Sequence, residues 1–343
     1  MANLSLADWA LRLDPNGAVG DILEMLSQCN EILSDIVWEE SNKADGHQTI
    51  LRTELPQPAY RAFNAGVPGT VSKVSRVEDK WGELFDWSYV DKSLADITGD
   101  HRKMRMMEDQ AHIEGMAQKV ASDLFYQDTA SNMAAFTGFS SRYGALSAYA
   151  SGKNVINGGG SGSSNSSIWL LGWSPDTLHG FFPKGTVAGM VYKDWGDIVP
   201  LRDQSTGYEY QGYRSSFTWR LGLATPDWRW GVRIANLDTT SAGLKGVAPF
   251  DIFAGLSAAV NALPNLGRIS NINKTDDPRR PSMNVKPAIY VNRMVRTAMD
   301  IQAIRDRNVL LTPSEYAGFA VTDFRGIPIR ICDALINTES TVS

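Results

Sequence analysis

The chain has 343 residues, which is enough for two domains or for one core with large excursions. Its net charge of −5 predicts no general attraction to nucleic acid, and no apolar run approaches the ~20 residues that span a bilayer. The N-terminus lacks the pattern of a secretory signal. We therefore expect a cytosolic product without a membrane anchor, in which Cys29 and Cys332 are buried, reduced thiols.

Residues 1–46 are predicted to form an N-terminal arm. Within it, residues 17–38 have the periodicity of an amphipathic helix, whose apolar face includes Ile22, Leu26 and Leu33. An isolated helix of this length cannot bury that face by itself. We therefore expect these side chains to dock elsewhere on their own chain or on a neighbouring subunit.

Residues 47–90 are predicted to form an extended hairpin and its base. Two strands flank the segment 56–70, which contains three prolines and two glycines. A two-stranded hairpin is marginally stable alone in water, and exposed apolar residues at its tip favour a partner subunit. On this hairpin, arginines could pair with neighbouring carboxylates and aromatic residues could fill pockets. The candidate interface residues are Arg52, Tyr60, Arg61, Phe63, Asn64 and Val67.

The longest predicted helix lies within residues 98–126, and a helix of about 25 residues gives a spine of roughly 38 Å at 1.5 Å per residue. Arg105 lies four residues before Asp109, a spacing that predicts a surface pair. We expect the apolar stripe of the helix to pack under a hairpin of residues 213–234. The stripe contains Met106, Ile113, Ala117, Val120 and Leu124, with Met116 beside it.

Two strands within residues 208–237 alternate apolar and polar side chains around a turn, which predicts an antiparallel hairpin. Four arginines occupy its polar face: Arg214, Arg220, Arg229 and Arg233. That face is either solvated or an inner surface that contacts nucleic acid or an acidic neighbour. From about residue 241 to 330, alternating helices and strands predict a second domain of mixed structure, followed by a tail.

The sequence offers no enzyme signature. Glu108 and His112 lie four residues apart on the spine, but a metal site usually needs at least three ligands and no second such pair occurs. No nucleophile elbow and no phosphate-binding glycine motif is present. We therefore predict no catalytic residue, no cofactor and no metal.

Several segments resemble the major capsid proteins of tailed bacteriophages, of the short-tailed-phage type, with the Hong Kong 97-like fold. They include LRTELPQPAYRAFNAGVPGT, EDQAHIEGMAQ, SIWLLGWSPDTLHGFFPKGTVAGMVYKDWG, WRWGVRIANLD and GIPIRICDALINTE. The resemblance implies an α+β fold built from five parts. These are an arm (1–46), an E-loop hairpin with its base (47–90), a peripheral domain with the spine (91–240), an axial domain (241–330) and a C-terminal tail (331–343).

The resemblance also implies a function: self-assembly into an icosahedral head that encloses double-stranded DNA without sequence specificity. The implied partners are other copies in hexamers and pentamers, a portal protein and, in some members, a decoration protein. The 46 residues before the E-loop are too few for a built-in scaffolding domain, so a separate scaffolding protein is expected. The implied location is the virion capsid, after assembly in the cytoplasm of a host bacterium.

Two other functions remain open at this stage. An encapsulin-like shell that stores a cargo enzyme would share the architecture, and a hydrolase could use two of the many carboxylates. Some members of the resembling family cross-link an E-loop lysine to another subunit. Because Lys73 and Lys80 are distant from the hairpin tip, we expect no such cross-link here.

Overall fold

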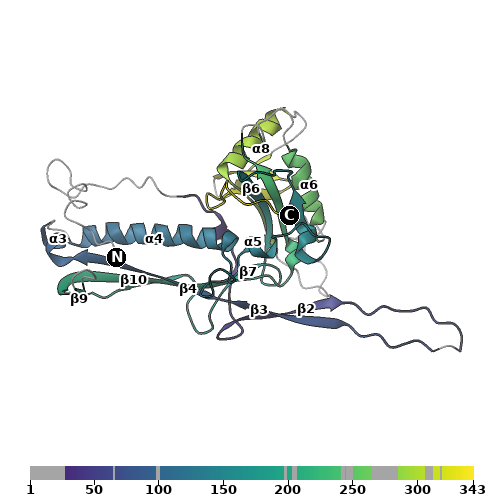
Figure 1. The fold of residues 1–343 in the computed structure, drawn as a ribbon, viewed down its shortest axis with the longest axis horizontal. Coiled ribbons are helices and arrows are strands. Elements are labelled where there is room, and N and C mark those ends of the chain that lie inside the picture. The colour runs from purple at the N-terminus through teal and green to yellow at the C-terminus, as the bar shows by residue number, and fades with distance from the viewer. Residues whose placement is uncertain are drawn as a thin grey trace.

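The computed structural model describes residues 28–64, 66–97, 101–196, 199–202, 207–240, 244, 250–264, 285–305, 312–316 and 319–343. These residues form two main sheets and a separate two-stranded hairpin (Figure 1). A long helix lies along the six-stranded sheet, further helices flank the seven-stranded sheet, and the hairpin extends away from both.

The six-stranded sheet is centred on β10 (Glu209–Ala224), a strand of 16 residues. One edge of β10 pairs antiparallel with β4 (Gly82–Asp91) at every position from Gly212, opposite Asp91, to Leu221, opposite Gly82. Along its other edge β10 pairs antiparallel with three short strands: β7 (His179–Phe182), β8 (Met190–Asp194) and β9 (Val199–Arg202). β7 in turn pairs in parallel with β1 (Trp38–Glu40).

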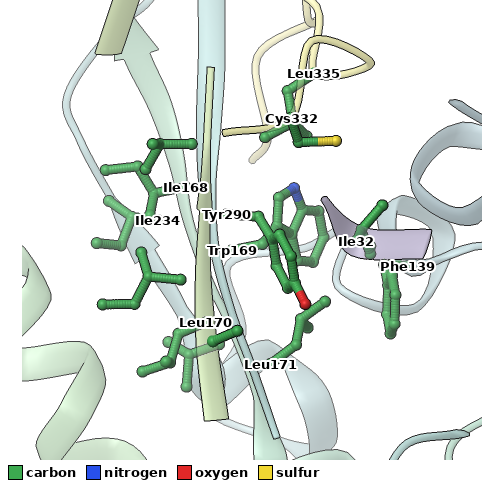
Figure 2. Packing of buried hydrophobic residues seen from close by; sticks show 14 of the residues in the cluster. Ile32, Phe139, Ile168, Trp169, Leu170, Leu171, Ile234, Tyr290, Cys332 and Leu335 are labelled. Carbon is green, nitrogen blue, oxygen red and sulfur yellow. The ribbon is translucent and has the colours of Figure 1, made fainter. Parts of the chain in front are cut away.

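The seven-stranded sheet has the order β13-β14-β15-β12-β6-β11-β5. Its central strand, β6 (Asn165–Trp173), is buried along its whole length. Figure 2 shows Ile168 and Leu170 on one face of the sheet and Trp169 with Tyr290 on the other. The remaining strands are β5 (Val155–Asn157), β11 (Gly231–Asp238), β12 (Lys286–Val291), β13 (Thr312–Tyr316), β14 (Phe319–Phe324) and β15 (Ile327–Ile331).

Helices cover both sheets. The spine helix α4 (His101–Tyr126) has 26 residues and packs on β4 and β10. The shorter elements are α2 (Ile32–Asp35), α3 (Lys92–Ile97), α5 (Phe139–Arg142), η1 (Ala150–Asn154), η2 (Trp228–Trp230), α6 (Ile252–Ala262) and α8 (Arg293–Arg305). Asp251 caps the start of α6, which packs on β11 of the seven-stranded sheet. Its carboxylate accepts a hydrogen bond from the Ala254 N–H at 2.9 Å.

The predicted apolar stripe of the spine is right for its second half and wrong for its first. Val120 and Leu124 are buried, and the helix ends with Phe125 against Trp169, with ring centroids 5.9 Å apart. Met106 and Ile113 are instead 72% and 40% exposed. The first half of the helix contacts the sheet through polar groups and through Met104, which is 3% exposed and packs with Val90, so Met106 and Ile113 face outward.

The predicted hairpin of residues 213–234 does not form. The first strand, β10, belongs to the six-stranded sheet, whereas β11 pairs with β6 in the seven-stranded sheet. The chain changes sheet at η2, where the Asp227 carboxylate accepts the Arg229 N–H at 3.1 Å. Strands from both sides of the predicted domain boundary at residues 240/241 pair in the seven-stranded sheet.

The N-terminal arm differs from its prediction as well. In the described part of residues 17–38, helix α2 ends at Asp35, and Ile36 is already extended. The helix stops because Ile36 packs into the core and Trp38 begins β1. Leu33 packs against the core of its own chain, and Ile22 and Leu26 lie outside the described residues.

The C-terminal residues 331–343 are not a free tail. Leu335 and Val342 are buried in the core, and Glu339 is only 5% exposed. Cys332 is also buried, which raises the pKa of its thiol to about 12, whereas Cys29 is half-buried. Neither cysteine forms a disulfide with another described residue, and the predicted burial holds for Cys332 but not for Cys29.

We predict that the two halves of the spine contribute very differently to stability. Phe125→Ala removes a fully buried ring and should lower the free energy of unfolding by about 3–5 kcal/mol. Met106→Ala, on the same helix but exposed, should change it by no more than about 0.5 kcal/mol. Urea unfolding of the two full-length variants measures the difference, and equal losses would contradict this packing.

Candidate assembly surface

The hairpin predicted for residues 47–90 is present, but it is shorter than expected. β2 (Gly46–Glu54) pairs antiparallel with β3 (Lys73–Lys80) and no other strand among the described residues. The predicted second strand, which ran to residue 90, is divided at Trp81: beyond that residue the chain continues as β4 and pairs with β10. The hairpin therefore continues directly from an edge of the six-stranded sheet.

The segment between β2 and β3 extends into solvent (Figure 1). Tyr60 and Phe63 are 105% and 102% exposed, so neither ring is covered by its own chain. Val67 is also exposed, and Asn64 adopts a left-handed backbone with φ of 62°, a conformation that Asn tolerates better than most residues. The structure thus places the candidate residues of the hairpin together on one projecting arm, with Arg52 and Arg61 also exposed.

The root of the hairpin is fixed by a network around Arg142 of α5. Its guanidinium lies 2.7 Å from the Asp79 carboxylate of β3, and it also donates to the Thr225 hydroxyl at 2.8 Å and the Leu223 carbonyl at 3.0 Å. The side chain of Asp79 is only 8% exposed, so this ion pair is largely shielded from water. Sequence reasoning missed Arg142, because nothing in the spacing of residues 79 and 142 indicates that they meet.

A polar seam joins the first half of α4 to the sheet. We define the seam by Arg105, Asp109 and His112 on the helix and their partners on the strands. Arg105 pairs with Asp194 rather than with Asp109, so the predicted surface pair is wrong. Asp109 is 8% exposed and accepts hydrogen bonds from the Tyr192 hydroxyl at 3.0 Å and the Ser215 hydroxyl at 3.2 Å.

His112 completes the seam and does not form a metal site with Glu108. Its Nδ1 lies 2.6 Å from an Asp86 carboxylate oxygen, and its ring stacks on Phe217 with centroids 5.8 Å apart. Among the described residues, no group of three or more His, Cys, Asp and Glu side chains could hold a metal ion. Nor does any helix in the described ranges have the length and apolarity to cross a bilayer.

The four arginines predicted to share one polar face lie in four different environments. The Arg214 guanidinium stacks between Trp87 and Trp195, at 4.6 and 4.3 Å from their ring centroids. Arg220 pairs with Glu83, and Arg229 pairs with Asp227 two residues before it. Arg233 is buried. The four guanidinium groups therefore do not form one common basic surface.

Arg233 instead forms the centre of a buried clasp, which we define as Arg233, Glu339, Tyr126 and Ser167. The guanidinium lies 2.9 Å from a Glu339 carboxylate oxygen, and the two side chains are 3% and 4% exposed. The other carboxylate oxygen accepts the Tyr126 hydroxyl at 2.5 Å, and Ser167 also donates to Glu339. Burial and the nearby carboxylate raise the pKa of Tyr126, which keeps its hydroxyl protonated as the donor. The clasp thereby ties the C-terminal residues to the end of the spine.

We predict that Arg233 is essential to the fold and Arg229 is not. Arg233→Met leaves the buried Glu339 carboxylate without its cation and should lower the free energy of unfolding by about 3–5 kcal/mol. The matched substitution Arg229→Met removes an arginine whose side chain is 59% exposed and should cost less than about 1 kcal/mol. Urea unfolding followed by far-UV circular dichroism measures both, and similar costs would show that the clasp does not stabilise the chain.

Several known proteins are similar to this chain in sequence or in fold. The family model for major capsid protein GP7 matches residues 14–343. A chain in the solved structure of bacteriophage Epsilon15 is 30% identical, with a TM-score of 0.77, and the match covers 100% of this chain and 98% of that chain. The capsid of bacteriophage JBD30 is 8% identical, with a TM-score of 0.48 and coverage of 91% and 92%. No curated protein sequence matches.

An encapsulin complex from Synechococcus elongatus PCC 7942 is also similar. It is 9% identical to this chain, with a TM-score of 0.41, and the match covers 69% of this chain and 97% of that chain.

Proposed function

This chain belongs to the major capsid protein GP7 family and is a structural capsid protein, and on that basis we propose how its parts serve in the shell. Many copies close into an icosahedral head that encloses double-stranded DNA. The observation that carries the proposal is the projecting hairpin, whose two tip rings are uncovered by their own chain. Such a tip gains stability only where another copy lies beneath it.

The hairpin arm lies over an adjacent subunit. Tyr60 and Phe63 serve as apolar anchors, because aromatic side chains supply most of the energy of an interface when a pocket buries them. Arg52 and Arg61 face carboxylates of the neighbour, while Asn64 and Val67 complete the tip. Since the arm of one copy meets a different surface of the next, the contact is heterologous and repeats around a ring of subunits.

The two sheets correspond to the two domains of the fold. The six-stranded sheet with α4 forms the peripheral domain, and the seven-stranded sheet with α6 and α8 forms the axial domain near the centre of each hexamer or pentamer. Sheet pairing supports this division, because β5, β6 and β11 pair with one another and with β12 rather than with β10. The axial domain therefore includes strands that precede residue 241.

Other partners follow from the assembly rather than from contacts within this chain. Ile22 and Leu26 of the N-terminal arm bind a neighbouring subunit. A separate scaffolding protein directs closure, a portal protein occupies one vertex, and a decoration protein is an optional addition. Assembly takes place in the cytoplasm of a host bacterium. The net charge of −5 suits packaged DNA, because a shell that adhered strongly to phosphates would hinder packaging and release.

We predict that the tip rings control assembly. Replacing both Tyr60 and Phe63 by alanine should raise the threshold concentration for particle formation at least about tenfold, since each anchor contributes roughly 1 kcal/mol or more. The control replaces Met133 and Tyr149, which are 89% and 81% exposed but lie outside the hairpin. Light scattering against protein concentration measures the threshold, with electron microscopy of the products. An unchanged threshold in the tip variant would refute the anchor role.

We also predict that this chain expressed alone forms irregular or open shells, because it lacks a partner that fixes curvature. Electron microscopy of the overexpressed protein gives the answer directly. Uniform closed particles would show that no scaffolding protein is needed. A sample that stays monomeric under all assembly conditions would contradict the proposed shell itself.

A further inference from the structure

Two histidines meet where the hairpin root contacts the six-stranded sheet. His47 is the second residue of β2, and His179 is the first residue of β7. Their ring centroids are 5.0 Å apart with an interplanar angle of 82°, and the His47 ring also lies 5.4 Å from Phe181. His179 is 1% exposed, while His47 is half-buried. The pair therefore forms part of the joint between the projecting arm and the body of the chain.

The surroundings of the pair suit neutral rings better than charged ones. Neither ring nitrogen of His179, nor Nδ1 of His47, makes a hydrogen bond of good geometry among the described residues, and the nearest acceptor to the His179 ring is the Pro175 carbonyl. Two carboxylates face the joint from neighbouring strands. The Glu39 carboxylate of β1 lies 3.9 Å from the Nε2 of His179 but is 37% exposed, and the Asp79 carboxylate of β3 is already paired with Arg142 of α5. Protonation of both rings would therefore bury two positive charges with only the partly exposed Glu39 carboxylate left to balance them.

We propose that this histidine pair is an acid-sensitive joint, which loosens the hairpin root from the six-stranded sheet when the rings become protonated. Two imidazolium ions 5 Å apart repel each other, and water can solvate both only if the root separates from β7. The arm could then change its angle, and the amide groups at the root, in β2, β3 and β7, would open to solvent more often.

The direction of the pH effect follows from linkage. Burial, reinforced by the neighbouring His47 and opposed by the Pro175 carbonyl, lowers the pKa of His179 from its ordinary 6.5 to about 4. Burial also lowers the pKa of His47, although Asp79 and Glu39 oppose that shift. A loosened root returns both rings to water and their ordinary pKa, so it binds protons more strongly than the docked root. Docking is fully favoured above pH 6.5, weakens as the pH falls towards 4, and changes no further below that.

For His179 alone, a fall in pKa from 6.5 to about 4 corresponds to roughly a 300-fold change in the equilibrium between docked and loosened roots. Even a tenth of that change in the docking equilibrium is large enough to be detected by hydrogen exchange. The joint belongs to a single chain, so this inference stands or falls separately from shell assembly.

The test is hydrogen exchange of the purified full-length chain between pH 7.5 and 4, read by mass spectrometry on peptides covering β2, β3 and β7. Rates are corrected for the intrinsic pH dependence of amide exchange. In the unmodified chain, we expect protection of these peptides to fall at least about tenfold between pH 6.5 and 4.5. His179→Gln, which cannot be protonated, should remove most of this fall.

Two further variants keep the test decisive. His101→Gln changes an exposed histidine of α4, and it should reproduce the unmodified pH profile. His47→Gln alters the half-buried member of the pair, so it should weaken the pH dependence even if His179→Gln fails to fold. The proposal is wrong if the unmodified chain shows no acid-dependent loss of protection. It is equally wrong if His47→Gln and His179→Gln both lose protection with falling pH as steeply as the unmodified chain does, whatever their overall stability.

Discussion

The pairing of β4 with β10 is the constraint on which most of this structure depends. Ten consecutive residue pairs, from Gly212 with Asp91 to Leu221 with Gly82, fix the register of the two strands. A shift of one residue would turn Phe217 and its neighbours to the other face and remove the surface on which the spine rests. Because β3 ends at Lys80 and β4 begins at Gly82, the same register also fixes the direction of the hairpin. The Hong Kong 97-like fold predicted from the sequence is confirmed.

The spine is held by different chemistry at its two ends. Its first half meets the sheet through the polar seam, in which Asp109 and His112 are matched to hydroxyl and carboxylate partners. Its second half packs Leu124 and Phe125 into the common core, and its last residue, Tyr126, joins the buried clasp. The clasp links four distant parts of the chain, so it fixes the end of the spine to the seven-stranded sheet and to the C-terminal residues.

Much of the architecture was predictable from the sequence, because local patterns of residues indicate its helices and strands. The hairpin and the spine follow from strand alternation and helical periodicity. Helix α8 begins after Asn292, whose side chain accepts the Met294 N–H at 2.8 Å, as expected of a residue type that favours helix starts. The pairing of strands was not predictable in this way. The alternation of β10 and β11 indicates two strands, but it does not say that each pairs in a different sheet. Likewise, Arg214 and Arg233 share a sequence pattern but not an environment, since tertiary partners such as Trp195 and Glu339 decide where each side chain lies.

The direct passage from β3 to β4 has a mechanical consequence. The two strands follow one another nearly in line, with only Trp81 between them (Figure 1). Tension applied at the tip of the arm therefore runs along β4 and loads its hydrogen bonds to β10 in shear, all at the same time, rather than peeling them apart one by one. A ladder loaded in shear fails only when many bonds break together. The resistance of the arm to a pull at its tip therefore comes from the β4–β10 pairing in the six-stranded sheet, far from the tip itself.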